Sequence, residues 1–457
     1  MNKHLLIPLI VALAVTIISG ILLSCNRQKN EHTSFLVHPD WSKNATIYEV
    51  NIRQYTPEGT FAAFEKHLPR LKEMGVDILW LMPINPIGEK NRKGSLGSYY
   101  AVQNYLTVNK EFGTLDDLKR LVNKAHELGM KVIIDWVANH TSWDNVLITE
   151  HPEWYQHDSS GHIKSPVKDW TDVAGLDYSH KGLRDYMTDA LKYWIKAADI
   201  DGYRCDVACM LPISFWDEAV PKLKTGKPIF MLAECETPEI HDTAFDMSYS
   251  WDFYHLMNDI AGGKGTANQI DTLLKKEVAH YNPDAYRMRF TSNHDENSWS
   301  GTEYERMGDA ARAMAVLTFT FPGMPLVYSG QEAAFNKRLR FFDKDTINWN
   351  GFILRDFYST LIRMKKENTA LWNGEQGTVL TKIQTNNDHH VYAFLRGTEG
   401  NQVLVMLNLT SQPQELKVKE IQLPGTFMNV FSGEATTFDY SLDFVLKPWE
   451  YRVYAKK

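Results

Sequence analysis

Cysteine is scarce in this sequence, with four residues among 457. This scarcity argues against a small disulfide-rich scaffold. Beyond Cys25, the spacing of Cys205, Cys209 and Cys235 fits no zinc site. Because three cysteines cannot all pair within one chain, we expect buried free thiols that pack as small hydrophobic residues, with a bridge between Cys205 and Cys235 as the alternative.

An excess of positive charge is also lacking. Lys and Arg number 49 against 56 Asp and Glu, which gives a net charge of −7, and no long run of like charge occurs. Nucleic-acid binding needs a basic surface, so we expect no nucleic acid partner. Internal repeats are absent, and the only low-complexity segment is the polar stretch after Cys25. With 44% hydrophobic residues, the chain can bury a large core.

Long hydrophobic runs are missing except for residues 5–23. This run follows Lys3 and leads into "LLSC", which ends at Cys25. A short basic start, an apolar run and a small residue before cysteine resemble a bacterial lipoprotein signal. We expect a signal peptide over 1–25, lipidation of Cys25, a polar linker over 26–40 and an exported protein anchored to the membrane. The alternative is an uncleaved anchor, because 19 apolar residues nearly span a bilayer.

From about residue 46, short apolar runs alternate with amphipathic helical patterns. The apolar runs predict eight strands, at residues 46–52, 76–84, 131–138, 202–208, 228–234, 245–250, 287–293 and 325–330. Helical patterns lie between them, such as 61–75 and 114–129, of which the second starts at an N-cap threonine and stops at a glycine. Eight strands alternating with helices predict an α/β fold, a (β/α)8 TIM barrel over residues 41–374.

Two segments depart from this alternation. Residues 141–178 are too long for a simple connection after the third strand and predict a small inserted subdomain. After about residue 374 the pattern changes to a period of two, as in residues 389–397 and 402–410. This change predicts a C-terminal β-sandwich over 375–457.

The fourth predicted strand carries a buried charge pair, Arg204 and Asp206, on one face because side chains alternate along a strand. Other polar residues also fall at strand ends, which in a TIM barrel meet at the catalytic face. They are Asp135, Asn139 and His140 after the third strand, Glu234 after the fifth, and Asn293, His294 and Asp295 after the seventh. From the residues alone, this rim is compatible with a metal site or with acid/base catalysis.

Four segments, "DWVANH", "GYRCD", "MLAE" and "SNHD", stand in this order at four of these strand ends. Together they resemble the short segments typical of the α-amylase family, glycoside hydrolase family 13. The stretch "GSYYAVQNYLTVNKEFGTLDDLKRLV" resembles that family's loop after its second strand. The resemblance covers about residues 41–375.

By position, the resemblance implies three catalytic residues: Asp206 as nucleophile, Glu234 as general acid/base and Asp295 as the carboxylate that stabilises the transition state. It also implies five substrate-binding residues, namely Tyr100, Asp135, His140, Arg204 and His294. A retaining glycosidase needs one ionised carboxylate to attack and one protonated carboxyl to donate to the leaving oxygen. Because Arg204 shares a strand face with Asp206, we expect it to keep the nucleophile charged.

Some of these assignments have a neighbour that competes for the role. The family pattern favours Glu234 over Glu236, Asp295 over Glu296 and Tyr100 over Tyr99. The chain also departs from the family, because Cys209 and Met210 stand where many members carry a Lys-His pair after the nucleophile.

Asn139 stands where many members of the family bind calcium. A loop-capping amide is an equal interpretation, because no set of partner carboxylates is evident. We therefore expect no cofactor in the chemistry and a structural calcium ion as the one metal that the resemblance allows.

The resemblance implies a retaining glycosidase that cleaves α-glucosidic bonds, in particular α-1,4 bonds, in starch-like glucans or malto-oligosaccharides. A transglycosylase or isomerase would share the first half-reaction, and the variable loops that separate these activities are not readable from sequence. A glucan-binding protein without catalysis is disfavoured because all three carboxylates are present. A metal-dependent barrel hydrolase is the remaining alternative.

Overall fold

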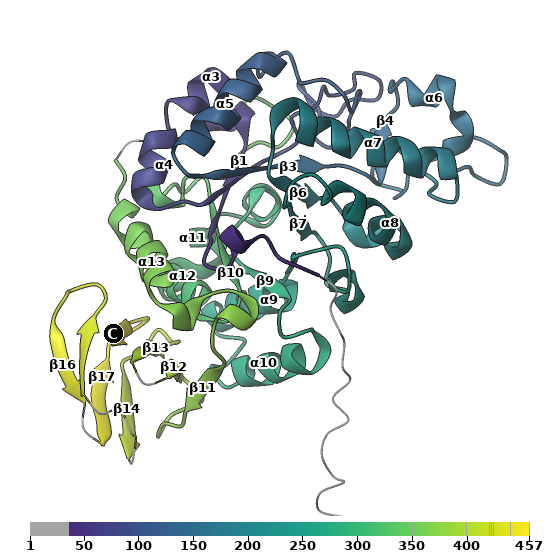
Figure 1. Ribbon diagram of the computed structural model, residues 1–457. Coiled ribbons are helices and arrows are strands. Elements are labelled where there is room, and N and C mark those ends of the chain that lie inside the picture. Colours follow the sequence, from purple (N-terminus) through teal and green to yellow (C-terminus); the bar gives the residue numbers. More distant parts are fainter. Residues whose placement is uncertain are drawn as a thin grey trace, which may run out of the picture. The chain divides into compact units, whose positions relative to one another are not determined.

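The computed structural model of the protein describes residues 36–456, apart from residues 350, 399, 420, 422, 424 and 439. Eight parallel strands close into a barrel in the order β1-β10-β9-β8-β7-β6-β3-β2 (Figure 1). They are β1 (Ile47–Val50), β2 (Ile78–Leu81), β3 (Lys131–Trp136), β6 (Gly202–Cys205), β7 (Phe230–Ala233), β8 (Met247–Tyr249), β9 (Tyr286–Arg289) and β10 (Met324–Tyr328). Each overlaps a strand predicted from the sequence, so the predicted TIM barrel is confirmed.

Helices surround the barrel. The longer ones are α5 (Leu115–Glu127), α7 (Lys181–Ala198), α8 (Ile213–Leu223), α9 (Trp251–Ala261), α10 (Gln269–His280), α12 (Ala311–Thr320) and α13 (Arg355–Glu367). The shorter ones are α2 (Ile52–Tyr55), α3 (Phe61–Glu65), α4 (Leu68–Met74), α6 (Leu147–Glu150) and α11 (Glu303–Met307). Helix α5 begins at a capping box between Thr114 and Asp117 and buries one apolar stripe against the barrel, as its sequence pattern predicts.

Two details differ from the sequence prediction. The single helix predicted over 61–75 is two helices, α3 and α4, because Pro69 lacks a backbone N–H and its ring would clash with the carbonyl of Glu65 in a continuous helix. The connection from β7 to β8 holds only a 3-10 helix, η4 (Pro238–His241), whereas two α-helices, α9 and α10, follow β8. The eight units are therefore not uniform.

The barrel interior changes character along its axis. Its core is filled by side chains on the inward strand faces, including Ile47, Trp80, Ile133, Leu232 and Met288. Two residues further along β1 and β3, toward the carboxyl ends, the same faces carry Glu49 and Asp135, and β6 adds Arg204. All three charged residues are fully buried, which requires that they be paired.

The segment after β3 is an insertion, as predicted. Its strands β4 (His140–Ser142) and β5 (Val173–Gly175) pair antiparallel, and helix α6 lies between them in the chain. The antiparallel register joins His140 to Gly175, so the insertion returns to the barrel beside the end of β3.

The C-terminal region is all-β, which confirms that part of the predicted fold. A six-stranded sheet has the order β11-β12-β13-β18-β15-β16, and β14 pairs with β17. The strands are β11 (Leu380–Ile383), β12 (Val391–Thr398), β13 (Asn401–Asn408), β14 (Gln414–Lys419), β15 (Gly425–Asn429), β16 (Ala435–Phe438), β17 (Ser441–Leu446) and β18 (Tyr451–Lys456). Leu404 and Met406 of the larger sheet share one hydrophobic cluster with Leu416 and Leu442 of the smaller one.

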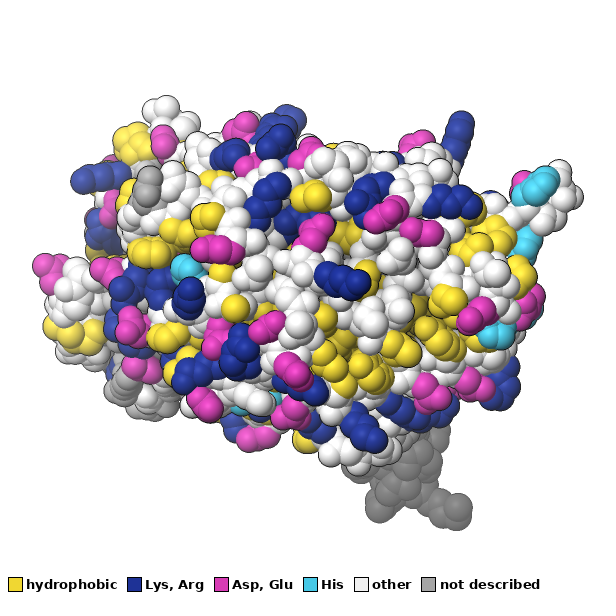
Figure 2. Space-filling view, turned by 90° about the horizontal axis from the view of Figure 1, so that it is seen from above, with side chains coloured by type: hydrophobic (Ala, Val, Ile, Leu, Met, Phe, Trp, Pro, Cys, Tyr) yellow, Lys and Arg dark blue, Asp and Glu magenta, His cyan; other side chains and the backbone are white. Residues whose placement is uncertain are grey.

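The predicted signal peptide over 1–25, with its lipidation site Cys25, and most of the linker over 26–40 lie outside the described residues. Among the residues that are described, no helix combines the length and the apolar character needed to cross a bilayer. The face shown in Figure 2 carries basic and acidic side chains interspersed with one another.

Candidate active site

A cleft of about 380 Å³ opens at the carboxyl ends of the barrel strands. All three predicted catalytic carboxylates, those of Asp206, Glu234 and Asp295, line it together with Tyr100 and His140. Aromatic side chains complete the walls, namely Trp170, Trp299, Phe341 and Phe342. A concave site of this size with a few convergent polar groups suits a small ligand or one part of a larger one.

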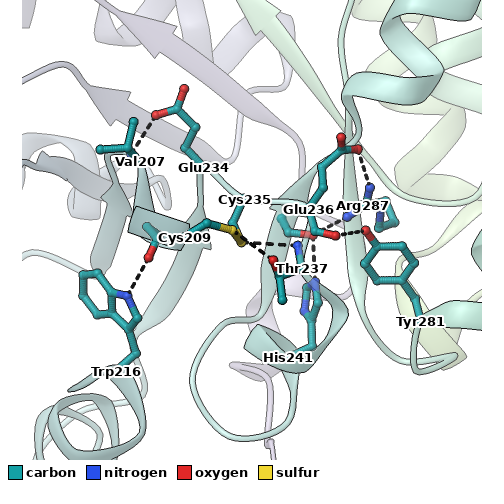
Figure 3. Close-up of a disulfide and its surroundings, with 12 residues drawn as sticks. Val207, Cys209, Trp216, Glu234, Cys235, Glu236, Thr237, His241, Tyr281 and Arg287 are labelled. Atoms are coloured by element: carbon teal, nitrogen blue, oxygen red, sulfur yellow. Dashed lines mark hydrogen bonds and ion pairs between the residues drawn. A yellow bond between two sulfur atoms is a disulfide. The ribbon is translucent and has the colours of Figure 1, made fainter. Parts of the chain in front are cut away.

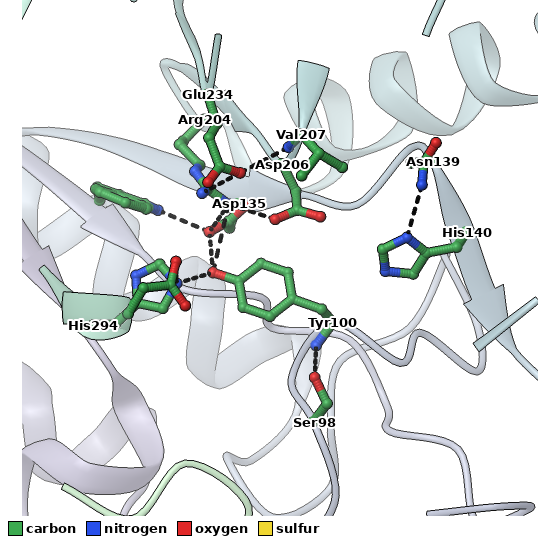
Figure 4. A network of polar contacts seen from close by, with 12 residues as sticks. Ser98, Tyr100, Asp135, Asn139, His140, Arg204, Asp206, Val207, Glu234 and His294 are labelled. Carbon is green, nitrogen blue, oxygen red and sulfur yellow. Dashed lines mark hydrogen bonds and ion pairs between the residues drawn. The ribbon is translucent and has the colours of Figure 1, made fainter. Parts of the chain in front are cut away.

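Arg204 lies at the centre of this site, below the floor of the cleft, with no exposed surface. Asp135 and Arg204 are register partners on β3 and β6, so their side chains project side by side into the barrel. Nη1 of Arg204 lies 2.9 Å from Oδ1 of Asp135 and 3.0 Å from Oδ1 of Asp206. Nη2 lies 2.8 Å from Oε2 of Glu234. One guanidinium thus joins three carboxylates (Figure 4).

The charge state of Asp206 differs from the sequence expectation. The predicted contact with Arg204 is present, but burial raises the pKa of Asp206 well above its usual value, and Arg204 opposes this rise. Glu234, Asp135 and Asp295 add to the rise through their negative charge. The guanidinium therefore offsets part of the cost of burying this carboxylate rather than moving its pKa below the usual value.

Asp295 is held by His294, whose Nε2 lies 3.1 Å from Oδ2 of the aspartate. Nδ1 of His294 contacts Oε1 of the buried Glu49 at 2.5 Å. Burial by itself disfavours a charged imidazole, but Asp295 and Glu49 together raise the pKa of His294 well above its usual value. For Asp295, burial is the largest influence and raises the pKa, but the charge and hydrogen bond of His294, the charge of Arg204 and a hydrogen bond from Trp299 together lower the pKa below its usual value. The pair is therefore an imidazolium and a carboxylate.

Tyr100 links Asp135 to His294. Its hydroxyl donates to Oδ2 of Asp135 at 3.0 Å and lies 2.8 Å from Nε2 of His294, as Figure 4 shows. Its ring stacks on His294 and lines the cleft. The neighbouring Tyr99 instead packs under the guanidinium of Arg53, which lies 4.4 Å from its ring centroid, and does not line the cleft.

The residue after Asp206 has an unusual backbone. Val207 adopts φ 37° and ψ 45°, a left-handed conformation that β-branched residues rarely take. Its backbone N–H donates to Oε2 of Glu234 at 2.8 Å. Such strain costs on the order of 1–3 kcal/mol and persists where the surrounding structure requires it, typically at functional sites. Here the turn directs an N–H toward the predicted acid.

The two competing glutamates lie elsewhere. Oε1 of Glu236 forms an ion pair with Nη2 of Arg287 at 3.0 Å, and Glu296 accepts a hydrogen bond from the hydroxyl of Tyr254. Neither lines the cleft. In Figure 3, the two carboxylates lie apart, that of Glu234 beside Val207 and that of Glu236 beside Arg287. The structure therefore brings Glu234, and not Glu236, to the other carboxylates.

Two cysteines in this region are paired, which corrects the sequence prediction. Cys209 and Cys235 form a disulfide, and Cys205 is a buried free thiol (Figure 3). The predicted alternative, a bridge between Cys205 and Cys235, is wrong because the sulfur of Cys235 is bonded to that of Cys209. The 3-10 turn η3 (Ala208–Met210) instead brings Cys209 beside the residue that follows Glu234. The bridge thus ties the chain after one predicted catalytic residue to the chain after another.

His140 and Asn139 lie at the mouth of the insertion. Burial lowers the pKa of His140 to about 4, so this side chain is a neutral imidazole at ordinary pH. Nδ2 of Asn139 lies 3.2 Å from Nδ1 of His140. In the part of the chain that is described, no three His, Cys, Asp or Glu side chains converge to hold a metal ion. The residues around Asn139 thus supply no acidic ligand set, and its role as a calcium ligand stays a prediction.

Several residues of this site were not predicted from the sequence, and Glu49 and Trp299 are two of them. Glu49 holds His294 from below, and Trp299 lines the cleft with 55% of its surface exposed. The sequence does hold an indication of Glu49, because a charged residue is unusual inside the apolar run "TIYEVNI". Nothing in the sequence distinguishes Trp299 from core tryptophans.

Comparisons with known proteins agree with this architecture. The family model for the α-amylase catalytic domain matches residues 29–174 and 168–378, and that for the maltogenic amylase C-terminal domain matches 380–453. The crystal structure of an α-amylase from Lactobacillus plantarum shares 33% identity at a TM-score of 0.82, over 91% of this chain and all of that one.

Curated relatives include enzymes of two reaction types. An α-amylase of Haloarcula japonica, MalA, is 28% identical over 392 residues, which are 82% of this chain. An α-1,4-glucan:maltose-1-phosphate maltosyltransferase of Picrophilus torridus is 26% identical over 411 residues, again 82% of this chain. The matches span 57% and 62% of the length of these two relatives. Since the catalytic-domain model matches well over half of the sequence, this chain belongs to the α-amylase family, glycoside hydrolase family 13.

Proposed function

We propose that this protein hydrolyses α-1,4-glucosidic bonds in starch-like glucans or malto-oligosaccharides with retention of anomeric configuration. The observation that carries the proposal is that the Arg204 guanidinium contacts Asp206 and Glu234 at once. Two carboxyl groups that share one guanidinium lie close together, which supports the separation of about 5–5.5 Å that a retaining mechanism requires. The aromatic walls of the cleft suit the apolar faces of sugar rings.

In the first step, a carboxylate oxygen of Asp206 attacks the anomeric carbon while the bond from that carbon to the leaving oxygen breaks. Glu234 donates its proton to that oxygen. In the second step, Glu234 takes a proton from water, the water oxygen bonds to the anomeric carbon, and Asp206 leaves as a carboxylate. Asp295, kept ionised by His294, stabilises the positive charge that develops on the sugar in both transition states.

Protein groups position these reactants before the chemistry. The Val207 N–H fixes Oε2 of Glu234, and Arg204 fixes both this acid and the nucleophile. Because burial raises the pKa of Asp206, this carboxyl is protonated more readily in the free site than an exposed aspartate is. Positive charge building up at the anomeric carbon then favours the ionised form of Asp206.

A transglycosylase is the second candidate, and the similarity to a maltosyltransferase supports it. Both activities form the same glycosyl-enzyme and differ in whether water or a sugar hydroxyl breaks it down. Incubation with maltoheptaose separates them, since only transfer yields products longer than the substrate. We expect shorter products alone, released in the α-anomeric form as seen by proton NMR.

The nucleophile assignment is tested by Asp206→Asn. We expect kcat to fall by at least about 10³-fold with an unchanged circular dichroism spectrum. Glu236→Gln is the matched control, because that carboxylate pairs with Arg287 outside the cleft and its loss should leave kcat within a few-fold of wild type. A folded Asp206→Asn enzyme with full activity contradicts the assignment.

We further propose that the enzyme is exported and tethered to the membrane through a lipidated Cys25. The basic start, apolar run and "LLSC" support this, and the Cys209–Cys235 disulfide is typical of an oxidising compartment outside the cytoplasm. Substituting Cys25→Ala in the producing cell should abolish incorporation of labelled palmitate. Equal labelling of wild type and variant would refute the tether.

A further inference from the structure

A second cleft, of about 580 Å³, lies outside the barrel wall. Its walls come from α10, from β9, from the two residues that precede β10, from residues 372–380 and from β12. We call it the junction cleft, because it separates the barrel from the C-terminal sheet. It contains none of the residues that line the active-site cleft. Leu274, Tyr281 and Trp372 give it apolar walls.

Three buried arginines reach the junction cleft, and two of them are paired. Glu277 accepts two hydrogen bonds from Arg289, at 2.9 and 2.6 Å. Arg287 pairs with Glu236 at 3.0 Å and approaches Glu277 at 3.5 Å. Both carboxylates, those of Glu236 and Glu277, therefore form ion pairs with two of the three guanidinium groups.

The third arginine, Arg396 on β12, is 1% exposed and has no such carboxylate. Its Nη1 donates to the backbone carbonyl of Thr320 at 3.0 Å. Among the described residues, no carboxylate forms an ion pair with it, and its buried Nε has no hydrogen-bond partner. Nearby, the buried Lys365 donates to the carbonyls of Gly323 and Leu371, and burial lowers its pKa well below the usual value. The positive charge at this place is therefore that of Arg396.

An unpaired buried cation is costly unless an anion or several dipoles compensate it. Burial, and then the charge of Arg289, lowers the pKa of Arg396 to about 9, so the side chain still carries its charge at neutral pH. A guanidinium presents a planar fork of donors that matches the oxygens of a carboxylate or a phosphate. Arg396 lines an open cleft into which such a group could enter from solvent.

We propose that the junction cleft binds a small oxyanion, a phosphate or carboxylate group, through Arg396. This site is separate from the proposed glycosidase site and does not depend on it. Its ligand is anionic, whereas the proposed substrate is a neutral sugar chain. Occupancy would compensate the buried guanidinium between the barrel and the C-terminal sheet and so stabilise the folded chain.

The test is isothermal titration calorimetry of the full chain with inorganic phosphate and, separately, with acetate, at an ionic strength held constant with sodium chloride. We expect one saturable site per chain for at least one of the two anions, and the comparison identifies which. Arg396→Gln should weaken binding by at least about tenfold, because it removes a charge-assisted hydrogen bond.

Two variants at exposed positions give a second test that leaves the buried core unchanged. Val379 lines the junction cleft and is 83% exposed, so Val379→Glu places a competing carboxylate at its rim without disturbing packing. Val445 is 63% exposed on β17 and does not line the cleft, which makes Val445→Glu the matched control. We expect at least about tenfold weaker binding in the first and unchanged binding in the second.

Three results would overturn the proposal. The first is that neither anion binds saturably, or that chloride displaces them at equal concentration. The second is that a folded Arg396→Gln binds as wild type does. The third is that Val379→Glu and Val445→Glu have equal effects, and this pair decides the question if Arg396→Gln does not fold.

Discussion

Removal of the Cys209–Cys235 disulfide should destabilise the protein by about 3.5 kcal/mol. The bridge closes a loop across a sequence separation of 26 residues, and the chain-entropy relation for a loop of that size gives about 12 cal/mol/K, hence this value at 25 °C. The loop contains η3, α8 and β7, so the cross-link constrains one complete unit of the barrel in the unfolded chain.

The same change should also reduce catalysis. Cys235 directly follows Glu234, and Cys209 lies three residues after Asp206, so the bridge holds the two loops that carry the proposed acid and nucleophile. A displacement of these carboxyl groups by a fraction of an ångström weakens a proton transfer and an attack that depend on alignment. We expect a several-fold loss of kcat with little change in KM.

The assay compares urea unfolding and steady-state kinetics of the wild type with those of Cys209→Ser/Cys235→Ser, each with and without dithiothreitol. Dithiothreitol should destabilise and slow the wild type but leave the double variant unchanged. Cys205 is a free thiol in both proteins, so it controls for thiol chemistry unrelated to the bridge. A loss of unfolding free energy below about 1 kcal/mol, or three free thiols in the oxidised protein by mass spectrometry, would refute the reasoning.

Three further predictions concern the active-site cleft. Glu234→Gln should lower kcat by about 10²–10⁴-fold on substrates with a poor leaving group and far less on nitrophenyl glycosides, whose leaving group needs no proton, as rate measurements on both would show. His140, whose folded pKa of about 4 lies below the unfolded 6.5, contributes stability above pH 6.5 that is lost as the pH falls to 4. Wild type should therefore lose about 3 kcal/mol of its free energy of unfolding between pH 6.5 and pH 4, and His140→Gln should not show this loss. Urea unfolding of both proteins at a series of pH values measures the difference. Trp299→Ala should lower kcat several-fold as well as raise KM for malto-oligosaccharides in steady-state kinetics, because the Trp299 side chain lines the cleft and also hydrogen-bonds to Asp295, whose pKa it helps to lower.

Much of the site could be predicted because barrels place the ends of their strands at one mouth. The residues after β3, β6, β7 and β9 come together through strand closure alone, which is why Asp206, Glu234 and Asp295 share a cleft. The contact between Arg204 and Asp206 follows from strand alternation. The effect of this contact on the pKa of Asp206 did not follow, because the outcome depends on how fully the carboxylate is buried and on how many others surround it.

The sequence by itself determined the strands, the barrel, the all-β C-terminal region and the residue types at the rim, because hydrophobic period and strand-end position are local properties of the chain. Only the tertiary structure decided that Cys209 pairs with Cys235, that Glu49 supports His294, and that Arg396 is buried with no carboxylate partner among the described residues. These outcomes depend on distances between segments that are remote in the chain. Such distances are fixed by the turn at Val207, by barrel closure and by the packing of β12 beside the barrel, and no local pattern encodes them.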